Sequence, residues 1–283
     1  VVVIDGGRPR NSPAAGVHGL LALDGIAPAE LLERGRVEVR RYGGHVVRGE
    51  VGAVARDDDG FAVTVAGGRT IRARRLLVAT GLVDELPDVP GVRERWGRDV
   101  LHCPYCHGWE VRDKAIGVLA SGPMSVHQAL MFRQWSPDIT FFSHTRPLTD
   151  EESTQLAARG IEVVHGEVSS LEIADDRIIG VRLNDGTVLG REVVAVSPRM
   201  VARAGFLEDL GLKPTEHPAG VGEHVPAEPN GRAAVPGVWV VGNVTDLAAQ
   251  VGGAAAAGAA AAMQINADLV DEETRLAVAA RSS

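Results

Sequence analysis

The stretch AIGVLASGPMSVHQALMFRQWSPDITFF occupies residues 115–142. It opens with a continuous apolar run, turns at Gly122-Pro123, continues with apolar residues at helical spacing, and ends in a second apolar run at 139–142. This order is typical of a β-α-β unit. A second helix is expected at 150–159 and a third strand at 161–165, so the pattern predicts a parallel sheet covered by helices.

The residues on either side predict shorter elements. After the unit we expect an antiparallel meander of 168–174, 177–183 and 188–192, and then a buried strand at 193–196. Before it we expect strands at 1–4, 37–41, 46–56 and 76–79, a helix at 28–34, and a hairpin of 61–65 with 70–73. Prolines make residues 84–91 resemble a linker.

The C-terminal residues return to the first unit. Residues 216–236 contain four prolines among glycines and predict a loop, which is followed by a buried strand at 237–242 and a helix at 252–270. We therefore predict an α/β chain of two Rossmann-like nucleotide-binding domains, each in three ββα layers, the second inserted into the first. The predicted domain limits are 1–87 and 231–283 for the first domain and 88–230 for the inserted one.

The composition argues against several classes of protein. With 45% hydrophobic and 23% charged residues among 283, the chain is globular. A net charge of −8 and only 4% aromatic residues argue against a nucleic-acid partner. No charge-free apolar run reaches about 18 residues, so we expect no membrane span.

The only two cysteines form the motif HCPYCHG at residues 102–108. A C-x-x-C spacing brings both sulfurs together across one helical turn, and a helix N-terminus stabilises a thiolate. The motif predicts a redox-active disulfide of Cys103 and Cys106, with His107 as acid and base and His102 as a helper. Three other interpretations compete with it: a covalent haem site, a zinc site, and a purely structural pair.

A second informative stretch runs from Ala234 to the alanine-rich helix that begins at Gly252-Gly253. A buried strand, a glycine turn and a helix with small side chains would let a planar cofactor lie against the backbone. The free N–H groups of that helix would face a group that becomes negative on reduction. Tight packing of alanine between helix and sheet is the simpler interpretation of the helix alone.

Together, the motif Val78-Ala79-Thr80-Gly81, the cysteine pair, residues 237–245 and the inserted order resemble the pyridine nucleotide-disulfide oxidoreductases of the bacterial thioredoxin reductase type. The details of residues 5–11, His18-Gly19 and the cysteine motif are most similar to one branch. That branch holds the flavin-dependent dithiol oxidases that close disulfides of the gliotoxin and holomycin type. The resemblance implies FAD, with NADPH possible, and a homodimer.

The resemblance also implies which residues bind FAD. Asp5 corresponds to the acidic residue on the adenosine ribose, Asn243 to the polar residue of the ribityl turn, and His18 lies in the stretch beside the flavin. The remaining implied cofactor residues are Gly6, Arg10, Asn11, Ala79, Thr80, Gly81, Gly242, Gln250 and Val251. No metal ligands are expected.

The sequence departs from the family in three places. It contains no G-x-G-x-x-G, and residues 1–5 match the family's second strand, so we expect a preceding strand and helix to be missing and FAD binding to suffer. The acid after the second cysteine is replaced by His107, as in the dithiol-oxidase branch. The second glycine motif falls on residues 120–125, which begin with Ala120 and end with Ser125.

The NADPH 2′-phosphate site of the family would fall on residues 143–146, where only Arg146 is basic. Without paired arginines, selection of NADPH is weak. The dinucleotide motif is thus degenerate, and this favours an oxidase that takes electrons from a small dithiol. An NADPH-dependent reductase of a thioredoxin-like protein is the alternative, and a non-catalytic binding module is a third. A reducible cysteine pair and a flavin suggest the cytoplasm.

Overall fold

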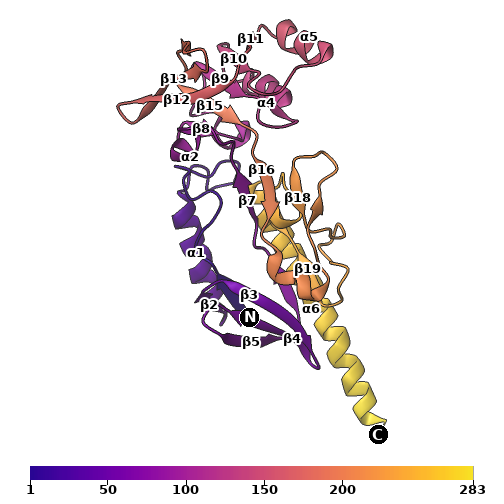
Figure 1. The fold of residues 1–283 in the computed structure, drawn as a ribbon. Helices are drawn as coiled ribbons and strands as arrows, with labels where there is room; N and C mark the ends of the chain where they lie inside the picture. The colour runs from indigo at the N-terminus through magenta and orange to yellow at the C-terminus, as the bar shows by residue number, and fades with distance from the viewer. Residues whose placement is uncertain (283) are drawn as a thin grey trace.

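A computed structural model describes residues 1–282 of the chain. Its upper part in Figure 1 is built on a five-stranded, wholly parallel sheet with the order β11-β10-β9-β15-β8. The strands are β8 (Val100–Leu101), β9 (Ile116–Leu119), β10 (Ile139–Phe142), β11 (Glu162–Val164) and β15 (Val193–Val196). The parallel unit predicted from residues 115–165 is confirmed.

Alternate residues of this sheet enter two different cores. Ile116 and Val118 pack with Phe132 of α4 (Ser125–Phe132) and with Leu156 of α5 (Asp150–Ala158). Leu119 points the other way, into a core formed with the antiparallel strands β12 (Val168–Ala174), β13 (Arg177–Leu183) and β14 (Val188–Leu189). Because strand side chains alternate between faces, one sheet is covered by helices and by a second sheet. These are the predicted ββα layers.

The lower part in Figure 1 repeats this layering on a smaller scale. The parallel pair β6 (Leu76–Val78) and β19 (Val238–Val240) lies between the antiparallel sheet of β3 (Val51–Asp57), β4 (Gly60–Val65) and β5 (Arg69–Ala73) and the long helix α6 (Val251–Arg281). Val238 and Val240 face β3 and β4, whereas Trp239 faces α6. A second parallel pair, β1 (Val2–Asp5) and β2 (His45–Arg48), is joined by α1 (Pro28–Arg41).

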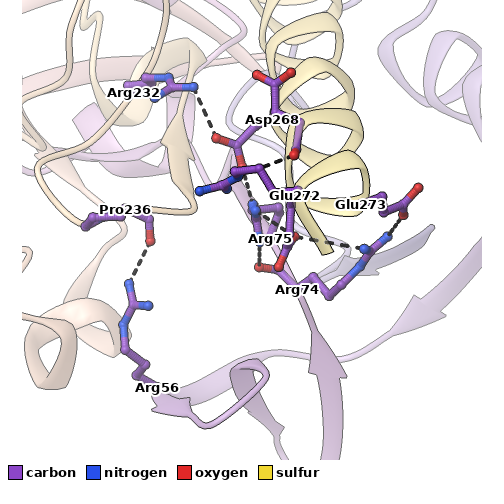
Figure 2. A network of polar contacts seen from close by, with 10 residues as sticks. Arg56, Arg74, Arg75, Arg232, Pro236, Asp268, Glu272 and Glu273 are labelled. Carbon is purple, nitrogen blue, oxygen red and sulfur yellow. Dashed lines mark hydrogen bonds and ion pairs between the residues drawn. The ribbon is translucent and has the colours of Figure 1, made fainter. Parts of the chain in front are cut away.

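Helix α6 extends to the C-terminus and is fastened to the corner between β5 and β6 by arginines (Figure 2). Arg75 donates to Asp268 at 2.6 Å and to Glu272 at 2.8 Å, and Arg74 donates to Glu273 at 2.8 Å. The side chain of Arg75 is 16% exposed. The second half of α6 is therefore attached mainly through charge, because Ala261, the one fully buried residue described in this helix, lies in its first half.

A four-stranded sheet that the sequence analysis did not foresee lies where the chain passes between the two parts. Its order is β17-β18-β16-β7. The strands are β7 (Leu82–Glu85), β16 (Arg199–Ala202), β17 (Thr215–Glu216) and β18 (Gly222–His224). The expected linker at 84–91 thus starts as a strand, and the expected loop at 216–236 contains one.

Two further expectations are wrong. Residues 37–41, expected as a strand, are the last turns of α1, where Arg36 and Arg40 reach back to Glu33 along the helix. The expected strand 46–56 is broken at residues 49–50 into β2 and β3, which belong to different sheets. A Cβ at Gly49 would lie 2.6 Å from Val65 Cγ1, so the chain passes too close to β4 to continue straight.

The remaining elements are short. They are α2 (Val92–Arg95), α3 (Pro104–His107), η1 (Gly205–Leu210) and η2 (Gly242–Val244). Among residues 1–282, no helix combines the length and the apolar character that crossing a membrane requires.

Candidate active site: a disulfide at the N-terminus of a long helix

The cysteine motif follows directly on β8. Cys103 caps α3, and its sulfur accepts a hydrogen bond from the Cys106 amide at 3.1 Å. Pro104 occupies the first helical position, where a missing N–H costs nothing. The two cysteines are joined as a disulfide with their Cα atoms 5.3 Å apart. The predicted pair is confirmed as a disulfide in this structure.

Neighbouring side chains fix the position of α3. A Cβ at Gly108 would lie 2.3 Å from both Trp135 Nε1 and the Pro104 carbonyl, so only glycine lets the indole pack there. Gln128, which is buried on α4, donates to the His102 carbonyl at 2.7 Å and to the Val196 carbonyl at 2.9 Å. The redox turn is therefore tied to α4 and to the end of β15.

The disulfide lies against the N-terminus of α6. Gln250 Oε1 is 3.2 Å from Cys106 Sγ, and Gln250 Nε2 is 3.7 Å from Cys103 Sγ. Gln250 is the N-cap of α6, yet its side chain makes no bond to the helix amides. The first amides of α6, including that of Val251, thus lack a side-chain cap beside the redox pair. Such amides carry partial positive charge and attract a group that becomes negative.

The turn before α6 is ordered by Asn243. Its amide nitrogen donates to the carbonyls of Asp246, Leu247 and Ala249, at 3.0, 3.4 and 3.0 Å. Gly242 has φ of +71°, a conformation that favours glycine, at the point where the chain leaves β19. The turn is thus self-supporting, and the oxygen of Asn243 remains for another donor.

The two histidines that flank the cysteines are neutral at pH 7. Burial, with a smaller contribution from the neighbouring Arg10 and against the opposing effect of Asp84, lowers the pKa of His102 to about 4. Burial also lowers the pKa of His107; Glu110 opposes this shift and His18 adds to it. A neutral imidazole can accept a proton from a thiol.

His18 lies close to this site, but in an arrangement that the sequence did not predict. Its Nδ1 is 3.2 Å from Asp24 Oδ2, and its Nε2 contacts Glu110 Oε1. Glu110 was not among the predicted site residues. Nothing local in the sequence marks it, because the contact joins segments far apart in the chain.

The other predicted cofactor residues lie at the ends of β1 and β6. Asp5 accepts from Arg36 at 2.8 Å and from the Gly7 amide at 2.8 Å, and these bonds, with Arg36 the larger cause, lower its pKa. Gly6 follows Asp5. Asn11 is half-buried, and Arg10 makes a two-pronged ion pair with Asp84, both bonds at 2.7 Å.

The turn after β6 is joined to the chain that returns from the upper part. Ala79, Thr80 and Gly81 are exposed or half-buried there. Thr80 donates to the Arg203 carbonyl at 2.6 Å, and Gly81 accepts from the Arg203 amide at 3.0 Å.

The turn between β9 and α4, where the family has its second glycine motif, is closed from within. The hydroxyl of Ser125 is fully buried and accepts from the amides of Ser121 and Gly122 at 3.2 and 3.1 Å. A cavity of about 410 Å³ lies beside it. Its lining residues are Pro87, Ala120, Ser121, Gly122, Pro123, His144, Thr145 and Arg146. Arg146 donates to Glu152 at 2.5 Å, while its Nη1 has no partner.

A half-buried cysteine pair facing an uncapped helix in a two-Rossmann-domain fold defines a disulfide oxidoreductase. The chain belongs to the pyridine nucleotide-disulphide oxidoreductase family, whose sequence profile matches residues 6–277. It is 31% identical to the thioredoxin reductase tcpT of Claviceps purpurea, over 86% of this chain and 78% of the relative. It is 30% identical to the thioredoxin reductase sirT of Leptosphaeria maculans, over 93% and 85%.

Solved structures show the same likeness. The crystal structure of HlmI superposes with a TM-score of 0.94 and 47% identity, over 99% of this chain and 88% of that one. The thioredoxin reductase-like family and the α/β two-domain fold expected from the sequence are confirmed, and the protein is an oxidoreductase.

The family binds FAD, and the residues present fit both ends of that cofactor. A pocket of about 250 Å³ next to Asp5, with Arg36 and Arg48 in its wall, suits the adenosine end. The uncapped, small-residue start of α6 suits the flavin end, because a flavin becomes negative on reduction. The glycine motif that cradles the pyrophosphate in the family is not in this sequence.

Proposed function

We propose that this chain oxidises small dithiols to disulfides, using Cys103 and Cys106 as the redox pair, FAD as the electron acceptor and oxygen as the final oxidant. The observation that carries the proposal is the disulfide seated on the uncapped N-terminus of α6 through Gln250. The net reaction converts a dithiol and O₂ into a cyclic disulfide and H₂O₂.

The chain's own residues perform the sulfur chemistry. One substrate thiolate attacks Cys103 Sγ and breaks the Cys103–Cys106 bond, which gives a mixed disulfide and a Cys106 thiolate. The second substrate thiolate then attacks the substrate sulfur that is bonded to Cys103, which forms the cyclic disulfide and releases Cys103 as a thiolate. Two electrons now reside on the cysteine pair. When bound, FAD supplies the two-electron acceptor that restores the disulfide and passes the electrons to oxygen.

We assign the substrate side to Cys103 and the flavin side to Cys106, because Cys106 Sγ lies nearer the side chain of Gln250, the residue that precedes α6. His107, kept neutral by burial, takes the substrate's thiol proton as general base. His102 assists by remaining neutral. A positive charge at His102 would pair with the cysteine thiolate near α3.

The closed turn between β9 and α4 supports electron entry from a dithiol rather than from NADPH. A pyrophosphate needs free amides at this position, and Ser125 already accepts from two of them. A second candidate function is the NADPH-dependent reduction of a thioredoxin-like protein. It is favoured by the 410 Å³ cavity and by the unpaired Nη1 of Arg146.

We further propose a cytoplasmic homodimer. The predicted domain limits, 1–87, 88–230 and 231–283, remain predictions. Leu207 and Val225 pack with Val54 of the first domain. This packing favours an earlier return of the chain to the first domain, between β15 and β16 rather than at residue 231.

Anaerobic reduction of the FAD-loaded protein tests the proposal. A small dithiol and NADPH are added in separate runs while the flavin absorbance band is followed. Bleaching by the dithiol alone, with recovery in air and one H₂O₂ formed per disulfide, is expected. Rapid bleaching by NADPH, with transfer to a thioredoxin, would instead establish the reductase. A protein that cannot be loaded with FAD would support the third interpretation, a non-catalytic binding module.

A further inference from the structure

A histidine flanked by two carboxylates connects the loop at residues 17–26 with the segment that follows the redox helix. His18 Nδ1 is 3.2 Å from Asp24, and His18 Nε2 contacts Glu110. The Gly19 amide also donates to Asp24 at 3.0 Å, which fixes the carboxylate on one side of the ring. The side chain of His18 is 22% exposed and that of Glu110 is 44% exposed.

One end of this bridge is anchored on α6. The loop is closed by the Val17 amide, which donates to the Ile26 carbonyl at 2.9 Å, and by the Gly25 amide, which donates to Val17 at 2.7 Å. A Cβ at Gly252 would lie 3.6 Å from the Gly19 carbonyl, so the loop rests on the first turn of α6. The His18 ring is therefore fixed relative to the helix end that receives the disulfide.

The other end of the bridge lies next to the redox helix in the chain. Glu110 lies three residues after His107, in the turn that leaves α3. The adjacent Trp109 is 59% exposed; it packs edge-on against Trp135, and the Arg112 guanidinium lies over its ring. Near the sulfurs, the attachment of the turn to α6 thus comes from Gln250 and from the pair of His18 with Glu110.

We infer that His18 and Glu110 are positioning residues that clasp the disulfide-bearing turn against α6, and that loss of the proton from His18 opens the clasp. The inference rests on the proposed function for its purpose, since a clasp at this place controls access to the redox sulfurs. Neither residue needs to touch the substrate for this role.

The charged groups around His18 set the direction of the pH effect. They are Asp24 on its own loop and Glu110 and His107 on the redox side; the facing turn of α6 has no titratable side chain. Burial lowers the pKa of His18, but Asp24 and Glu110 together outweigh it and raise the pKa above its usual value. The clasp is therefore complete below the usual pKa of histidine and is lost as pH rises through the raised value.

Reduction of the Cys103–Cys106 disulfide by dithiothreitol tests the clasp without flavin turnover. The purified chain is treated from pH 6 to pH 9, and free cysteines are trapped by alkylation and counted by mass. Glu110→Gln removes the charge partner, and His18→Lys keeps a positive charge across the whole range. Glu30→Gln, which breaks an exposed pair with Arg34 on α1, is the matched control. Rates are expressed relative to the native chain at the same pH, which cancels the titration of the reagent.

At pH 6 we expect the Glu110→Gln chain to be reduced about fivefold faster than the native chain, and at pH 9 equally fast. The disulfide of the His18→Lys chain should be reduced as fast as that of the native chain at pH 6 and more slowly at pH 9. A ratio for Glu110→Gln that stays near one, or that does not change with pH, would overturn the inference. If Glu110→Gln does not fold, the His18→Lys comparison alone decides between the two outcomes. Because no FAD is involved, failure of the proposed oxidase reaction leaves this result interpretable.

Discussion

The two Rossmann-like parts of the molecule each contain a strand, a turn and a helix at the place where such folds bind nucleotides, and the two turns differ in their amides. Between β9 and α4, the buried Ser125 hydroxyl accepts from two backbone amides. Between β19 and α6, the N-cap Gln250 leaves the amides without a side-chain cap and turns its side chain to the disulfide. The same local architecture is therefore closed in one part and open in the other.

A turn of the nucleotide-binding type can keep its shape while a side chain of its own helix accepts from its amides. At β9–α4 the amide donors are satisfied internally, so the turn contributes to stability. At β19–α6 the amide donors remain for a ligand, so α6 lacks the stabilisation that a side-chain N-cap would give. The backbone amides of such a turn can serve ligand binding or stability, and each of the two turns uses them for one of these purposes.

The largest effect is expected at the disulfide that lies against the open turn. Cys106→Ser should lower the rate of dithiol oxidation by about 10⁴-fold or more, because Cys103 and Cys106 act as one unit and neither forms the redox disulfide alone. Steady-state H₂O₂ formation measures it. Ser125→Ala in the closed turn should leave the rate within about twofold of native. An equal loss in both variants would mean that both turns serve catalysis.

A second prediction concerns the side chain that links the closed turn to the redox turn. Gln128→Leu should lower the free energy of unfolding by about 2 kcal/mol, because the buried carbonyls of His102 and Val196 lose their donor. Urea denaturation followed by fluorescence measures it. Gln155→Leu, at an exposed position of α5, is the control and should change stability by less than about 0.5 kcal/mol. Native-like stability of the Gln128 variant would show that water replaces the amide.

The smallest effect is expected in the closed turn itself. Ser125→Ala should cost about 1 kcal/mol of unfolding free energy, because the amides of Ser121 and Gly122 lose their acceptor. The same freed amides should let inorganic pyrophosphate protect the variant, but not the native chain, against thermal unfolding. Protection of the native chain by pyrophosphate would show that the turn is open after all.

Long periodic segments and the cysteine motif were predictable from the sequence, because their signals are local. The unit at 115–165 and the pair Cys103–Cys106 needed only spacing and apolar pattern. Residues 37–41 were mistaken for a strand because Val37 and Val39 alternate with charged residues, yet charges one turn apart continue the helix. The strands β7, β16 and β18 have only four, four and three residues, which is too short for a period to be recognised in the sequence.

The contacts that complete the site lie beyond such local signals. Glu110 meets His18, and Gln250 meets both sulfurs, only after distant segments have folded together. The closure of the β9–α4 turn by Ser125 was likewise not predictable. The sequence shows that a glycine of the motif is missing, but not that the Ser125 hydroxyl accepts from the turn amides in place of a ligand.

Helix α6 is fastened in two different ways along its length, and ionic strength acts on them unequally. Its middle packs through Ala261 and Ile265 against Trp239, an apolar contact that kosmotropic salts such as sulfate strengthen. Its far half depends on the ion pairs of Arg74 and Arg75, which weaken as the Debye length shortens to roughly 3 Å at 1 M salt, the more exposed pair of Arg74 most. Concentrated salt therefore loosens the C-terminal turns first, while the end that faces the redox pair keeps its place.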